Sequence, residues 1–116
     1  MIICAIDDLI FSIKVSTAAK SLKADVYFER SGDKLLETIR EKRPALVIFD
    51  LNSARLRPLD AIAALKRDPD LSATKTLGYV SHVDTATIEA ARAAGIDQVM
   101  ARSTFVAQLG DILTSA

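Results

Sequence analysis

The chain has 116 residues, with 15 Lys and Arg, 15 Asp and Glu, one Cys and one His, and half of its residues are apolar. This length fits one compact domain over residues 1–116, and the composition is that of a globular protein. A net charge of zero argues against a dedicated nucleic-acid surface and against a polybasic membrane anchor. No apolar run approaches the roughly 20 residues of a membrane-spanning helix. With no export signal and a lone Cys4, the expected location is the cytoplasm.

Short apolar runs alternate with amphipathic segments along the chain. Their content of β-branched and aromatic residues predicts five strands, at residues 2–6, 24–29, 45–49, 76–80 and 98–101. The run at 45–49 is the most apolar, which is typical of a central parallel strand buried on both faces. After each strand, apolar residues spaced by three or four predict a helix. Five successive strand–helix units predict a parallel α/β sheet with helices on both faces and right-handed crossovers.

Local signals predict where the helices begin and end. Ser31 and Ser103 are the expected N-caps of the second and last helices, and Asp84 is the expected N-cap of the fourth. Pro58 fits the first turn of the third helix, and Gly95 fits the position just after the fourth. No internal repeat or linker interrupts this order.

Apolar spacing also predicts which side chains reach the core. The expected buried face of the first helix carries Phe11, Val15, Ala18 and Leu22. Phe49 and Phe105 are expected in the core rather than in a cofactor site, and Tyr79 is expected to be partly buried on its strand.

Polar residues follow the predicted strands at the point where each strand ends. They are Asp7, Asp8, Asp50, Asn52, Ser81, His82 and Arg102. Ligands of an open parallel sheet bind at the carboxyl ends of its strands, so we expect these side chains to meet, with His82 facing solvent. Three carboxylates at close range favour a bound cation, and oxygen ligands suit Mg²⁺. The hydroxyl of Ser81 and the charge of Arg102 can hold phosphate oxygens. The pattern predicts an acidic, Mg²⁺-dependent phosphoryl site.

Four features of the sequence occur together in one known family. They are the pair Asp7-Asp8 after the first strand, Asp50 at the end of the third, Ser81 after the fourth, and Ala94-Gly95 before the fifth. With these features at these spacings, the chain resembles a response-regulator receiver domain over essentially its whole length. The resemblance implies a (βα)5 doubly wound, flavodoxin-like sheet with strand order 2-1-3-4-5.

The resemblance also implies a role in two-component signal transduction. Asp50 would accept a phosphoryl group from a histidine kinase or phosphotransfer protein. Ser81 and Arg102 would contact that group. The residues that would bind Mg²⁺ are Asp7, Asp8, Asp50 and Asn52, the last through its backbone carbonyl. Such a stand-alone receiver is not an enzyme beyond self-catalysed phosphotransfer and dephosphorylation.

A downstream protein, rather than nucleic acid or membrane, would read the surface formed by the fourth helix, fifth strand and last helix. The parts that transmit the signal depart from the family's pattern. Arg102-Ser103 stand where the family has Lys-Pro, and Val99 stands at its aromatic switch position. The usual rotamer switch therefore cannot operate in its ordinary form. The alternative function is a pseudo-receiver that acts as a phosphorylation-independent docking module.

Two further classes of function fit the sequence less well. A Mg²⁺-dependent phosphatase usually needs a second carboxylate shortly after its nucleophile, and Asn52 stands at that place. A nucleotide-binding protein of flavodoxin type would need a phosphate loop rich in Gly, Ser or Thr after the first strand, where the chain has Asp7-Asp8-Leu9-Ile10.

Overall fold

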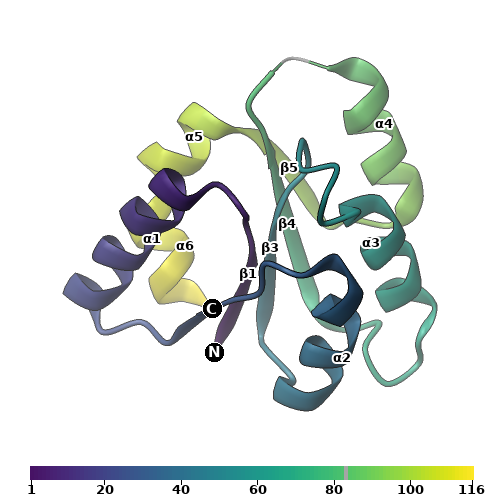
Figure 1. Cartoon of the computed structure of the whole chain (residues 1–116), viewed down its shortest axis with the longest axis horizontal. Coiled ribbons are helices and arrows are strands. Elements are labelled where there is room, and N and C mark those ends of the chain that lie inside the picture. The colour runs from purple at the N-terminus through teal and green to yellow at the C-terminus, as the bar shows by residue number, and fades with distance from the viewer. Residues whose placement is uncertain (83) are drawn as a thin grey trace.

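Five parallel strands form the centre of a computed structural model that describes residues 1–82 and 84–116 (Figure 1). The strands are β1 (Ile2–Ala5), β2 (Val26–Phe28), β3 (Leu46–Asp50), β4 (Lys75–Val80) and β5 (Gln98–Ala101). The helices are α1 (Leu9–Leu22), α2 (Gly32–Lys42), α3 (Pro58–Arg67), α4 (Thr85–Ala94), α5 (Arg102–Ala107) and α6 (Leu109–Ser115). The strand order β2-β1-β3-β4-β5 confirms the predicted α/β sheet.

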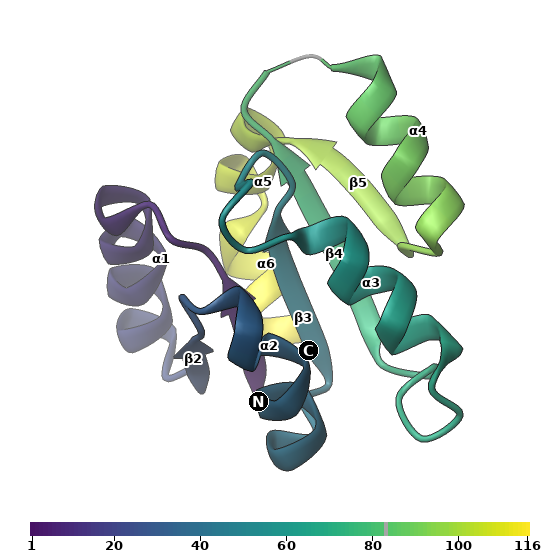
Figure 2. The same ribbon diagram turned by 45° about the vertical axis from the view of Figure 1, so that its right-hand side comes forward.

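The sheet separates two apolar layers (Figure 2). Helices α2, α3 and α4 cover one face, and helices α1, α5 and α6 cover the other. Successive residues of a strand point to opposite faces, so Val47 and Phe49 enter the first layer and Ile48 enters the second. Burial on both faces is the reason that β3 is apolar at every position before Asp50.

Most of the predicted helix boundaries are confirmed. Pro58 is the first residue of α3. The side chain of Asp84 accepts a hydrogen bond from the backbone N–H of Thr87 at 3.2 Å, which caps α4. Gly95 ends α4 with a φ of 105°, a left-handed conformation that glycine adopts without strain. Ser31 holds the N-cap position of α2, although its side chain makes no capping hydrogen bond among the described residues.

The last helix differs from the prediction in two ways. It begins at Arg102, so Ser103 lies inside its first turn and is not the N-cap. It is also interrupted at Gln108, whose φ of −101° and ψ of 6° separate α5 from α6. Gly110, a poor helix former, follows two residues later.

The first helix, α1, buries a face close to the predicted one. Phe11 and Val15 are buried, and Ala19 joins them. The prediction for Leu22 is wrong, because this last residue of the helix keeps 42% of its surface exposed. Apolar spacing gives the direction of a side chain but not whether another element covers it. Neither α1, with its 14 residues, nor any other described helix is long and apolar enough to cross a membrane.

Gly78 of β4 lies in a tightly packed part of the core. A Cβ atom there would lie 2.7 Å from Cγ of Leu51 and 2.8 Å from Cδ1 of Ile96. Gly78→Ala is therefore expected to destabilise the fold by about 1–3 kcal/mol, because buried side chains would have to move. Urea unfolding followed by circular dichroism measures this change in the free energy of unfolding.

The same substitution at Gly110 is the matched control. Gly110 lies in α6, and among the described residues a Cβ atom there would meet Leu22 at 3.9 Å, an ordinary contact. Gly110→Ala is expected to stabilise the protein by about 0.5 kcal/mol, because alanine favours a helix. Losses of equal size at both positions would contradict the packing argument.

Candidate functional site

The carboxyl ends of β1 and β3 bring the predicted acidic residues together. These two strands are neighbours in register, with Ala5 opposite Phe49, so the residues that follow them lie side by side. Asp50 is the last residue of β3, and Asp7 and Asp8 follow β1. Both of these aspartates lie near enough for their charge to raise the pKa of Asp50.

Asp50 is partly buried, and its environment opposes ionisation. Burial is the largest cause of the raised pKa of Asp50, and the charges of Asp7 and Asp8 add to it. Two features act in the other direction and lower the pKa. The backbone N–H of Asn52 donates a hydrogen bond to Oδ1 of Asp50 at 3.0 Å, and the charge of Arg102 attracts the carboxylate. On balance, the pKa of Asp50 stays above its ordinary value.

Asp8 combines a structural contact with its place in this acidic group. Its Oδ1 accepts a hydrogen bond from the backbone N–H of Phe11 at 3.1 Å, which caps α1. A carboxylate has two oxygens and about four acceptor positions, so one capping bond leaves room for another ligand. Helix capping and metal binding are therefore compatible at Asp8.

The side chain of Asn52 joins the two loops that flank Asp50. Its Oδ1 accepts a hydrogen bond from the backbone N–H of Ser81 at 2.6 Å. Ser81 follows β4, and Asp50 lies opposite Tyr79 in the sheet, which places Ser81 at the same edge. The sequence predicted a role for the backbone carbonyl of Asn52 but gave no sign of this side-chain contact.

An aromatic cluster of Phe11, Tyr79 and Phe105 lies beside Asp50 on the layer that holds α1 and α5. The ring of Tyr79 stacks on Phe105 at 5.0 Å and lies 5.2 Å from Phe11, measured between centroids. Tyr79 is only 1% exposed, so the expectation of partial burial is wrong. Its hydroxyl has no hydrogen-bond partner among the described residues, and burial and the charge of Asp50 raise its pKa.

Arg102 lies at the edge of this aromatic cluster. Its guanidinium carbon is 4.4 Å from the centroid of the Phe11 ring, a cation–π contact. Its charge reaches Asp50, yet no described carboxylate forms an ion pair with it. Spacing alone assigned Phe11 to the core, so the sequence did not predict that its ring would hold the guanidinium. His82 is exposed, as expected.

The residues at this site fit a hard divalent cation such as Mg²⁺. The donors are oxygens, and burial together with the charges of Asp7 and Asp8 raises the pKa of Asp50, a carboxylate that a bound cation would stabilise. Among the described residues, no three side chains of the Asp, Glu, His or Cys type are already arranged around a single metal position. Mg²⁺ commonly binds through one or two carboxylates and completes its shell with water, which suits this arrangement.

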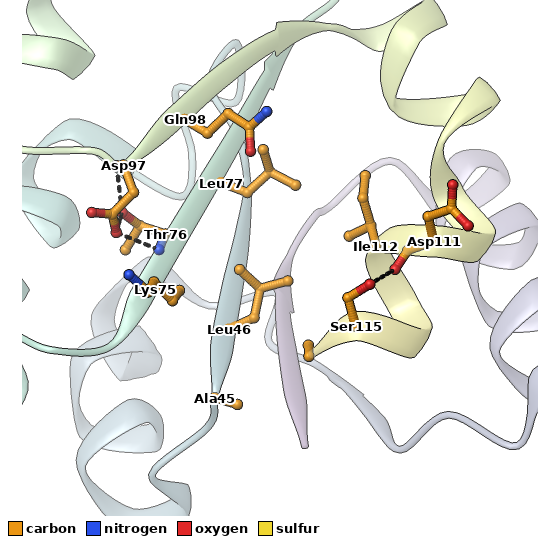
Figure 3. Close-up of a pocket in the computed structure, with 11 residues that line it drawn as sticks. Ala45, Leu46, Lys75, Thr76, Leu77, Asp97, Gln98, Asp111, Ile112 and Ser115 are labelled. Carbon is orange, nitrogen blue, oxygen red and sulfur yellow. Dashed lines mark hydrogen bonds between the residues drawn. The ribbon is translucent and has the colours of Figure 1, made fainter.

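A groove of about 590 Å³ lies at the opposite end of the sheet, between the strands and α6 (Figure 3). Leu46 and Ile112 line it. Of the two aspartates that line it, Asp97 and Asp111, Asp97 accepts a hydrogen bond from the N–H of Thr76 at 2.8 Å and pairs with Lys66 at 2.9 Å. Burial opposes ionisation of Asp97, but these partners outweigh it and hold its pKa below the ordinary value. The contacts of Asp97 therefore serve the fold, and the groove holds none of the residues of the predicted site.

Comparison with known proteins places this geometry in a fold family. No family model and no curated protein sequence matches the chain. A response regulator from Hahella chejuensis superposes with a TM-score of 0.86 at 15% identity, covering 97% of this chain and 91% of that one. A two-component response regulator from Legionella pneumophila gives 0.79 at 15% identity, over 99% and 98% of the two chains.

A third structure carries a metal at its own site. It is the receiver domain of a sensor histidine kinase from Pseudomonas aeruginosa, with a magnesium ion coordinated in its active-site cleft. Its TM-score is 0.84 at 16% identity, covering 98% of this chain and 93% of that one. Strand order and near-complete superposition agree, and the chain therefore has the fold of response-regulator receiver domains.

Proposed function

We propose that this chain is a receiver that accepts a phosphoryl group on Asp50 in a two-component system and signals by contact with another protein. The observation that carries the proposal is the setting of Asp50. This carboxylate ends β3, the central strand of the sheet, lies beside two further carboxylates, and has a raised pKa. Perturbed carboxylates at the carboxyl edge of a parallel sheet are typical of functional sites.

The proposed reaction is an in-line transfer from a phosphohistidine. A carboxylate oxygen of Asp50 attacks the phosphorus, the P–N bond breaks, and its electron pair returns to the imidazole nitrogen, which takes up a proton. The product is an acyl phosphate on Asp50, which water later hydrolyses to inorganic phosphate and the free carboxylate. A Mg²⁺ ion held by Asp7, Asp8, Asp50 and the carbonyl of Asn52 would neutralise charge on the transferring group.

Two further groups have assigned roles in this proposal. The hydroxyl of Ser81 donates a hydrogen bond to a phosphoryl oxygen, and the bond from its N–H to Asn52 fixes the position of its backbone. Arg102 supplies a guanidinium, which binds phosphate oxygens through two parallel N–H donors. Ser81 follows β4, the strand next to that of Asp50, and Arg102 follows β5, one strand further along the same edge of the sheet.

Exposed apolar side chains next to the site support a protein as phosphodonor. Leu9, Ile10 and Ile13 are 64%, 83% and 58% exposed, and they begin one residue after Asp8. Apolar surface of this kind commonly marks a protein contact. A histidine kinase or phosphotransfer protein would dock there, and a downstream protein would read the surface of α4, β5 and the last helix, which is divided into α5 and α6.

One observation favours the pseudo-receiver as second candidate. The guanidinium of Arg102 rests on Phe11 instead of pairing with Asp50. In a docking module that works without phosphorylation, Asp50→Asn would leave affinity for the partner unchanged with or without a phosphodonor.

The proposal predicts covalent labelling of Asp50. Incubation with phosphoramidate and Mg²⁺ is expected to add the mass of one phosphoryl group, because the proposal assigns a single phosphoacceptor, Asp50, to the acidic site. Asp50→Asn should abolish the mass change, and chelation of Mg²⁺ should reduce it at least tenfold, equivalent to about 1.4 kcal/mol in the barrier.

Asp25→Asn is the control for this labelling experiment, because Asp25 is an exposed aspartate before β2. It should be labelled like the wild type. Intact-mass spectrometry and mapping of the labelled peptide distinguish the outcomes. A wild type that stays unlabelled, under conditions in which an ordinary receiver reacts, would contradict the phosphoacceptor proposal and favour the docking module.

The setting of Asp50 also predicts a pH-dependent effect on stability. A carboxyl whose pKa is higher in the folded than in the unfolded state weakens the fold once it ionises. Asp50→Asn is therefore expected to raise the free energy of unfolding at pH 7, since burial and its neighbours raise the pKa of Asp50. The gain should shrink as the pH falls through the raised folded-state value, and vanish below the ordinary value of 3.8.

Urea unfolding of the wild type and Asp50→Asn at a series of pH values measures this gain. Asp25→Asn, at an exposed position, should give no comparable gain. A lower free energy of unfolding for Asp50→Asn at neutral pH would contradict this expectation, because it would mean that the carboxylate stabilises the fold.

A further inference from the structure

We propose that Phe11 is a positioning residue, whose ring holds the guanidinium of Arg102 away from Asp50 and thereby limits how tightly the site takes a phosphoryl group. The inference rests on the proposed function and concerns the regulation of the same site. Phe11 does not touch the reacting atoms and acts only through Arg102.

The contacts of Arg102 are the first evidence that Phe11 holds its guanidinium. Its guanidinium carbon lies 4.4 Å from the centroid of the Phe11 ring. Among the described residues, no carboxylate forms an ion pair with it, and no side-chain hydrogen bond from it is formed. The charge nonetheless lowers the pKa of Asp50, so the two groups lie near each other without direct contact. The guanidinium thus occupies a resting position beside the site.

The ring that holds Arg102 is itself fixed. Phe11 is only 3% exposed, and its centroid lies 5.2 Å from Tyr79 and 6.0 Å from Phe105. Its backbone N–H is also bound to the side chain of Asp8. A ring held on several sides cannot follow the guanidinium toward Asp50, so Arg102 must leave its face in order to contact a phosphoryl group.

The guanidinium of Arg102 can contact either the Phe11 ring or a phosphoryl group on Asp50. Competition between these two positions sets the size of the change in affinity. A cation on an aromatic face is favoured by a factor of roughly 3 to 10 in equilibrium when it is partly exposed. A state that must first give up this contact binds its ligand more weakly by the same factor. Guanidinium stacks on rings better than ammonium does, so Arg at position 102 gives Phe11 a stronger hold than Lys would.

The test is calorimetric titration with beryllofluoride, a phosphoryl mimic, in the presence of Mg²⁺. Phe11→Leu is expected to bind it three- to tenfold more tightly than the wild type, because Arg102 loses its resting place. Phe105→Leu is the matched control, since it removes a ring from the same cluster while the cation–π contact of Arg102 is with Phe11. Its affinity should stay within about twofold of the wild type.

Two further variants separate positioning from packing. Phe11→Tyr keeps the aromatic face and should restore the wild-type affinity. In an Arg102→Ala background, Phe11→Leu should no longer change the affinity, because the coupling passes through the guanidinium. If Phe11→Leu does not fold, as judged by circular dichroism, Phe11→Met fills the space with a flexible side chain and carries the same expectation.

The outcomes distinguish this inference from the proposed function. Binding by the wild type without tightening in Phe11→Leu overturns the inference and leaves the phosphoacceptor function intact. Equal tightening in Phe105→Leu, or tightening that persists without Arg102, also overturns it. Binding by Phe11→Leu but not by the wild type supports it, and absence of binding in both contradicts the inference and the function together.

Discussion

The carboxylate of Asp50 stands at the end of the central strand β3, beside two other carboxylates, and this crowding of negative charge shapes the edge of the sheet around it. Burial and like charge both oppose its ionisation. Two groups act against this effect, the N–H of Asn52, which donates a hydrogen bond to Asp50, and the nearby charge of Arg102, which makes no direct contact with it. Neither Asn52 nor Arg102 neutralises the carboxylate of Asp50. A divalent cation bound at the site would supply the positive charge.

Aromatic side chains next to Asp50 connect the site to the helices on one face of the sheet. Asp50 lies opposite Tyr79, whose ring packs between Phe11 of α1 and Phe105 of α5. Arg102 begins α5 and rests on this cluster. The aromatic cluster therefore connects the surroundings of Asp50 with the first turn of α5, and it does so without an aromatic residue on β5.

The other end of the sheet has the opposite character. There the carboxylate of Asp97 is fully used, accepting bonds from Lys66 and from the backbone and hydroxyl of Thr76. These contacts tie the end of α3 to the starts of β4 and β5. Asp97 is thus paired at the end where the strands begin, whereas Asp50 has no ion-pair partner among the described residues where the strands end.

The sequence by itself determined the five strand–helix units, because apolar periodicity and turn residues such as Pro58 and Gly95 act locally. It also placed the polar residues of the site, because parallel strands end at one edge of a sheet. Only the tertiary structure decided the contacts across that edge. The bond between Asn52 and Ser81 joins residues 29 positions apart, and the stacking of Arg102 on Phe11 joins the last helices to the first. Such pairings depend on which elements pack together in space, which no local pattern encodes.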